Sequence, residues 1–184
     1  MTDKRGFTLI ELLVVIAIIG ILASILITNI TTAIQKTKQK QTMAVIVGIA
    51  GACAHYVTDT GYAPAAGSQS GELQAGSDFV KVVSPTYIKY CPLNDQWGHP
   101  FLVYTGKAVS GVYNIPDEDT SDDDFLIVSL GRDGEEGGTL TYTYDPNNPS
   151  AGLYTLEAPA DFNNDLINMN GSWLHAPLRL NPGS

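Results

Sequence analysis

The chain has 184 residues, of which 44% are hydrophobic and 16% are charged, and this balance excludes an intrinsically disordered protein. The formal net charge is -9, which also excludes a role that depends on holding nucleic acid through its phosphates. Two cysteines are too few for a zinc ribbon or a disulfide-dense scaffold, and the length suits one domain with an appendage.

Charge and hydropathy divide the chain into two unequal parts. Residues 1–55 contain two acidic and five basic residues, which leaves 17 acidic and five basic residues for positions 56–184. The apolar run at residues 12–27 is interrupted only by Gly20 and Ser24, and with its apolar flanks it approaches the roughly 20 residues that cross a bilayer. The sequence therefore predicts an apolar N-terminal helix followed by an acidic globular part.

Two general interpretations of the apolar segment are a secretory signal peptide and a plain membrane anchor. The run is longer than the apolar region of a signal peptide, and no A-x-A cleavage pattern closes it. An anchor fits the length but leaves Glu11 unexplained, because an isolated carboxylate in hydrocarbon costs a few kcal/mol. Glu11 therefore needs a positive partner, and another chain is one source of it.

The N-terminal residues carry a third and more specific signal. Residues 4–23 combine a short basic leader, Gly6 before Phe7, a glutamate five residues into the mature chain and an uninterrupted apolar helix. This segment resembles the start of type IV pilins and of type II secretion pseudopilins. The resemblance implies that a prepilin peptidase cleaves between Gly6 and Phe7, which removes the leader at residues 1–6, and that Phe7 is then N-methylated. It also implies that Glu11 meets the Phe7 amino group of a neighbouring subunit during assembly.

The same resemblance implies a location and a set of partners. The leader would lie in the cytoplasm, one helix would span the bacterial inner membrane, and the globular domain would lie in the periplasm. Charge alone leaves this orientation ambiguous, because basic residues flank both ends of the apolar segment. The expected partners are the membrane, identical subunits in a helical homopolymer, minor pseudopilins, the prepilin peptidase, and the assembly platform with its ATPase. The assembled filament would be periplasmic or extracellular.

The helix is expected to continue beyond the membrane with a different character. Residues 7–30 would form the transmembrane and filament-core part, and residues 31–58 an amphipathic second half. The second half carries one apolar stripe at helical spacing, which we interpret as a face that packs on a sheet. The stripe consists of Ile46, Ile49, Ala50, Cys53 and Val57.

Residues 59–184 are predicted to form a globular β-rich domain with an extended C-terminal region. A short helix is expected at residues 77–83. Short apolar runs separated by turn residues favour an antiparallel sheet packed on the helix stripe, which is an α+β fold of the type IV pilin kind. The expected strands are residues 101–104, 111–115, 125–130, 140–144 and 153–156.

Two motifs in the globular part are similar to segments of the major pseudopilins. Residues 95–101 read DQWGHPF and are similar to their D-P-W-G-x-P-Y segment, and residues 129–138 read SLGRDGEEGG and are similar to their S-L-G-x-D-G-x-x-G-G loop. These motifs favour a major pseudopilin over a generic type IV pilin. The tail at residues 139–184 is longer than the ending of that family. Together with the N terminus, the resemblance covers residues 4–64, 95–104 and 124–138.

The second motif also predicts a calcium site. The loop that it resembles binds calcium in major pseudopilins, which implies that Asp133 contributes its carboxylate and that Leu130 and Glu135 contribute carbonyl oxygens. A second carboxylate from near the C terminus maps to Asp165, which precedes Trp173 at a longer spacing than in the family. Calcium favours such a mixture of hard oxygen ligands.

An independent pattern in the tail supports the same ion. Residues 161–165 read D-x-N-x-D, so Asp161, Asn163 and Asp165 supply the alternating oxygens that open calcium loops of the EF-hand type. The glycine and the terminal glutamate of a complete EF-hand are missing, so we expect one arm of a shared site. A polar turn without a metal is the alternative. The acidic segment at residues 117–124 is expected to be a solvated loop.

The remaining reactive side chains are few. Cys53 and Cys91 are expected to form a disulfide, because the periplasm is oxidising and the bridge would pin the helix to the sheet. Two separate thiols are the alternative. The histidines stand apart from other metal ligands, and the sequence has no nucleophile elbow and no phosphate-binding glycine loop. We therefore expect a protein without enzymatic activity.

These observations predict a structural subunit that polymerises into a calcium-stabilised type II secretion pseudopilus, which acts as a piston or scaffold for protein export. One alternative is a subunit of an extracellular type IV pilus used for adhesion or motility. Another is a single-pass membrane-anchored binding protein that never polymerises.

Overall fold

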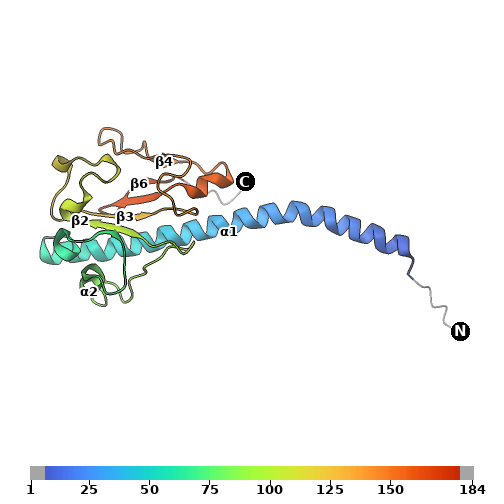
Figure 1. Cartoon of the computed structure of the whole chain (residues 1–184), viewed down its shortest axis with the longest axis horizontal. Helices are drawn as coiled ribbons and strands as arrows, with labels where there is room; N and C mark the ends of the chain where they lie inside the picture. The colour runs from blue at the N-terminus through green and yellow to red at the C-terminus, as the bar shows by residue number, and fades with distance from the viewer. Residues whose placement is uncertain (1–6, 179–184) are drawn as a thin grey trace. The chain divides into compact units, whose positions relative to one another are not determined.

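In the computed structural model, which describes residues 7–178, a long N-terminal helix is followed by a mixed region of short helices and strands (Figure 1). The chain divides between Gln35 and Lys36 into two compact units. The helices are α1 (Leu9–Thr60) and α2 (Asp78–Val83). The strands are β1 (Ser70–Glu72), β2 (Leu102–Thr105), β3 (Phe125–Ser129), β4 (Leu153–Tyr154), β5 (Leu166–Met169) and β6 (Ser172–Pro177).

The first unit is the apolar part of α1. Its large hydrophobic side chains are exposed, and the most apolar window of α1 is long and apolar enough to cross a membrane, with none of that window buried in the chain itself. A surface of this kind is stable only against lipid or against other apolar helices. The observation fits the prediction of a membrane-anchoring helix.

In the second unit, the C-terminal part of α1 lies along the sheet (Figure 1). Its contact with the sheet is a buried stripe of side chains. The predicted residues Ile46, Ile49 and Cys53 are fully buried, and the stripe extends to the polar residues Gln39 and Thr42, which are buried as well. The helix ends at Thr60. The amide of the following glycine, which has a positive φ, donates to the carbonyl three residues before the helix end.

The six strands form one sheet in the order β1-β2-β3-β5-β6-β4. All neighbouring strands are antiparallel except β4 and β6, which pair in parallel through Leu153 and Tyr154. Every residue of β3 is buried, because its alternating side chains enter two different clusters. Phe125 and Ile127 join the cluster around α1, and Leu126 joins a second cluster on the opposite face. The α+β fold predicted from the sequence is confirmed.

Two predicted strands are wrong. Residues 111–115 contain a 3-10 turn at Val112–Asn114, because Gly111 and Tyr113 have positive φ angles that are incompatible with an extended strand. Residues 140–144 are irregular: Tyr142 is buried in the second cluster, but the segment pairs with no strand among the described residues.

Three strands were not predicted, namely β1, β5 and β6. The hairpin of β5 and β6 turns through Asn170 and Gly171, with φ angles of 53° and 84°. An Asn-Gly pair between two apolar runs is the sequence signal of such a two-residue turn, so this hairpin was readable from the sequence. The short helix predicted at residues 77–83 is confirmed as α2. The amide of Val80 donates to the side chain of Ser77, which caps the helix N terminus.

Candidate functional site

The first predicted site lies at the start of α1. The carboxylate of Glu11 accepts hydrogen bonds from the amide and the hydroxyl of Thr8, at 2.8 and 2.6 Å. The amide of Glu11 donates back to the Thr8 hydroxyl at 3.3 Å, which completes a capping box at the helix N terminus. Phe7 is largely exposed beside it. Glu11 therefore has a local hydrogen-bond partner in Thr8, and it forms no ion pair with any residue in the described range 7–178. The predicted cleavage after Gly6 lies outside the described residues.

The second site is built on the loop that contains the first of the two motifs. One carboxylate oxygen of Asp95 accepts hydrogen bonds from the amides of Trp97, Gly98 and His99, at 2.9, 2.9 and 3.0 Å. The other oxygen accepts the hydroxyl of Ser129 at 2.7 Å. The buried Asp95 thus folds its own loop and ties it to the last residue of β3, where the second motif begins.

The loop of the second motif, residues 130–138, lies directly against residues 161–165, which immediately precede β5. We call these five residues the tail arm. The amide of Arg132 donates to the carbonyl of Phe162 at 2.8 Å. A Cβ atom added to Gly131 would lie 2.8 Å from the carbonyl oxygens of Asn163 and Asn164, and one added to Gly138 would collide with Asn163. Glycine is therefore required at both positions for the loop to come this close to the tail arm. We call the loop and the tail arm together the cradle.

Asp165 is the last residue of the tail arm and is 1% exposed. Its Oδ2 accepts hydrogen bonds from the hydroxyl of Tyr113 at 2.8 Å and from the amide of Gly137 at 3.0 Å. Its Oδ1 is buried and has no hydrogen-bond partner in the described part of the chain. Burial raises the pKa of Asp165 to about 6, and the charges of Glu136 and Asp133 add to the increase, whereas the two hydrogen bonds oppose it. An orphaned carboxylate oxygen among negative charges is where a cation would be most stabilising.

The structure brings together only part of the predicted ligand set. Asp133 lies close enough to Asp165 to raise its pKa, and Leu130 and Glu135 belong to the same loop. Asp161 instead caps a 3-10 turn, because its Oδ2 accepts the amides of residues 157 and 158, both at 2.7 Å. The side-chain oxygen of Asn163 accepts the Nε of Arg132 at 2.8 Å. Within residues 7–178, no group of three or more His, Cys, Asp and Glu side chains could hold a metal, so a site here needs carbonyl oxygens.

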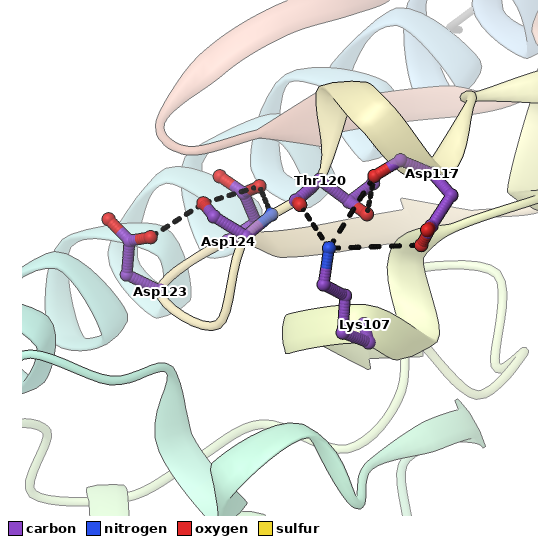
Figure 2. Close-up of polar contacts among 6 residues, drawn as sticks. Lys107, Asp117, Thr120, Asp123 and Asp124 are labelled. Atoms are coloured by element: carbon purple, nitrogen blue, oxygen red, sulfur yellow. Dashed lines mark hydrogen bonds and ion pairs between the residues drawn. The ribbon is translucent and has the colours of Figure 1, made fainter.

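Lys107, from the preceding 3-10 helix at Gly106–Val109, contacts the acidic segment at residues 117–124, as Figure 2 shows. The ammonium of Lys107 donates to the carbonyl of Thr120 at 2.6 Å and lies 3.8 Å from a carboxylate oxygen of Asp117. Asp124 is buried, and its Oδ1 accepts the side-chain amide of Asn170 at 2.6 Å. The loop is therefore fastened to the fold at both ends, and Lys107 supplies positive charge among its acidic side chains.

Comparison with known proteins identifies the family. Residues 1–27 match the family described as the prokaryotic N-terminal methylation motif. The chain is 30% identical to the type II secretion system core protein G of Escherichia coli strain K12 over 141 residues, which cover 74% of this chain and 88% of the relative. The chain belongs to the type II secretion system core protein G family.

A second core protein G, from Vibrio cholerae serotype O1, is 30% identical over 152 residues, or 77% of this chain and 89% of the relative. The fimbrial protein EcpC of Eikenella corrodens is 38% identical over 68 residues, or 37% of this chain and 44% of that protein. No solved structure matches the chain significantly. The resemblance to major pseudopilins is thereby confirmed, and about a quarter of this chain lies outside each core protein G alignment.

The predicted disulfide is not formed in this member of the core protein G family. Cys53 and Cys91 are both buried in the cluster around α1, and both are free thiols. Burial raises the pKa of Cys53, with a contribution from Cys91, and burial raises the pKa of Cys91 to about 11. Protonated thiols in apolar surroundings react slowly.

Sequence reasoning missed Tyr113, which contacts the candidate site through Asp165. Tyr113 lies in the segment that was predicted to be a strand, and its hydroxyl reaches Asp165 across 52 positions of the sequence. The only local signal of this turn was Gly111 itself, because glycine readily adopts the positive φ that the turn requires. The buried Gln39 and Thr42 were missed as well, because the predicted stripe began only at Ile46.

Proposed function

We propose that this chain is the subunit that polymerises into the pseudopilus of a type II secretion system, and that the filament acts as a piston or scaffold for exporting folded proteins. Membership of the core protein G family supports the assembly. The methylation motif at residues 1–27, followed by an exposed apolar helix, is the observation that carries the proposal. The chain has a filament-core helix and a separately folded domain, and the proposal assigns it no enzymatic reaction.

The subunit would begin as a single-pass precursor in the inner membrane, with its globular domain in the periplasm. Prepilin peptidase would cleave between Gly6 and Phe7, and Phe7 would be N-methylated. An assembly platform and its ATPase would then extract the subunit, alongside minor pseudopilins. Because Glu11 is an acidic residue within an apolar segment, the new amino group of Phe7 on a neighbouring subunit is its natural partner.

Calcium binding at the cradle is part of this proposal. Asp165 fits the ion because its buried Oδ1 has no hydrogen-bond partner within residues 7–178, and the charge of Asp133 acts on the same carboxylate. The carbonyls of Leu130 and Glu135 complete the set that we propose, whereas Asp161 and Asn163 have other partners and are left out of it. A bound calcium ion would neutralise the buried carboxylate and hold the loop of residues 130–138 to the tail arm.

Mass spectrometry of the chain extracted from membranes tests the processing step. The proposal predicts a mature chain that begins at Phe7 and carries one added methyl group at its N terminus. A chain that starts at Met1 in cells with an active prepilin peptidase would contradict it and would support the membrane-anchored binding protein. A known pilin from the same cells serves as the control for peptidase activity.

A further inference from the structure

Tyr113 holds an unusual backbone conformation next to the proposed cation site. Its φ and ψ angles are 49° and 31°, and the following Asn114 also has a positive φ of 60°. This left-handed conformation is unfavourable for residues other than glycine, and more so for tyrosine than for asparagine, so the surrounding structure must hold it. The side chain that this backbone presents donates its hydroxyl to Oδ2 of Asp165.

The tail segment at residues 139–144 supplies much of that support. The amide of Tyr144 donates to the carbonyl of Tyr113 at 3.0 Å, and the ring of Tyr142 lies 6.3 Å from the ring of Tyr113. A cavity of about 350 Å³ lies beside these rings and is also lined by Glu136 and Gly137. The segment begins at Thr139, whose amide and hydroxyl both donate to the side-chain oxygen of Asn164 beside Asp165.

We propose that Tyr113 is a positioning residue for cation binding at Asp165, and that the long tail of this chain holds it in place. The hydroxyl of Tyr113 engages Oδ2 and so fixes the plane of the carboxylate. Oδ1 is buried and has no hydrogen-bond partner within residues 7–178, which leaves it available to a cation. A neighbour that orients a ligating carboxylate in this way contributes to metal affinity without touching the metal. The inference rests on the proposed calcium site.

Calcium titration calorimetry on the full chain in detergent tests the inference, with Tyr113→Phe compared with the wild type. The variant keeps the ring and loses the hydroxyl, so we expect calcium affinity to fall by about 10-fold or more. Tyr142→Phe is the matched control, because its ring lies beside that of Tyr113 and lines the same cavity, and it should keep wild-type affinity. Thermal melting without calcium measures the structural contribution of the hydroxyl separately.

Equal calcium affinities for Tyr113→Phe and the wild type overturn the role of Tyr113 and leave the calcium site standing, whatever the melting temperature of the variant. A wild type that binds no calcium overturns the calcium proposal and this inference together. One measurement needs no variant at Tyr113: calcium should change the near-ultraviolet circular dichroism of tyrosine in the wild type and in Tyr142→Phe. An unchanged spectrum in a wild type that does bind calcium counts against Tyr113.

Discussion

The hydroxyl of Ser129 donates a hydrogen bond of 2.7 Å to the buried carboxylate of Asp95. This bond joins the loop that follows Asp95 to the end of β3, and Ser129 in turn accepts the amide of Gly131 at the start of the candidate calcium loop. The two motifs by which the sequence resembles major pseudopilins are thus parts of one hydrogen-bonded unit.

Replacing Asp95 with alanine should destabilise this unit. Three partly buried amides and the buried hydroxyl of Ser129 would lose their acceptor, which we expect to lower the free energy of unfolding by about 2 kcal/mol. Chemical denaturation followed by circular dichroism measures the change. Asp119→Ala is the matched control, because Asp119 is exposed and should change stability by less than about 0.5 kcal/mol. Equal effects of the two substitutions would contradict the structural role of Asp95.

Calcium should stabilise the wild type, and Asp165→Asn should remove that effect. At a calcium concentration of 100 times Kd the gain is about 2.7 kcal/mol, or roughly 5–10 °C in melting temperature. Without calcium, the variant should melt at or above the wild-type temperature, because it no longer buries a carboxylate with an unpartnered oxygen. Thermal melts with calcium and with a chelator give both comparisons. A wild type whose melting temperature ignores the chelator argues against the site.

His175 should make the fold sensitive to acid. It is buried between the rings of Tyr142 and Tyr154, at centroid distances of 5.4 and 5.0 Å, and burial lowers its pKa to about 4. Between pH 6.5 and 4 the unfolded chain binds a proton that the folded chain does not, so stability falls as the pH falls through this range. The loss amounts to about 3 kcal/mol at most.

The variant His175→Phe isolates this contribution, because other groups titrate in the same range. The wild type should lose more stability than the variant between pH 6.5 and 4, as measured by denaturation at each pH. Parallel stability curves for the two proteins would show that His175 is protonated without cost in the folded state.

The sequence predicted the parts of the fold that have local signals. The apolar run and the stripe around Ile46 predicted α1, and a short helix was expected at residues 77–83, where α2 lies. Residues 111–115 misled because their β-branched and aromatic side chains favour a strand, while the turn depends on the positive φ of Tyr113, which no local pattern predicts. The Asn170–Gly171 turn had a local signal that the calcium interpretation of the tail obscured.

The candidate site was predicted only where a local motif in the sequence indicated it. Asp133 and Asp165 were identified from motifs, and the structure places their segments against each other. The D-x-N-x-D spacing predicted Asp161 as a ligand, but its carboxylate accepts two backbone amides close to it in the sequence. Such local hydrogen bonds form more readily than a contact with a distant loop. The contact of Tyr113 with Asp165 depends on tertiary packing and could not be read from spacing.

The most direct test of the polymerising subunit is electron microscopy of filaments from cells that express Glu11→Gln in place of the wild type. Glutamine still accepts the hydrogen bonds of Thr8 and so preserves the helix cap, but it removes the charge. Glu118→Gln, which removes an exposed acidic charge from the globular domain, is the control. We predict filaments for the wild type and for Glu118→Gln, and processed but unassembled subunits for Glu11→Gln. Abundant filaments of Glu11→Gln, or a wild type that is processed and never assembles, would contradict the account.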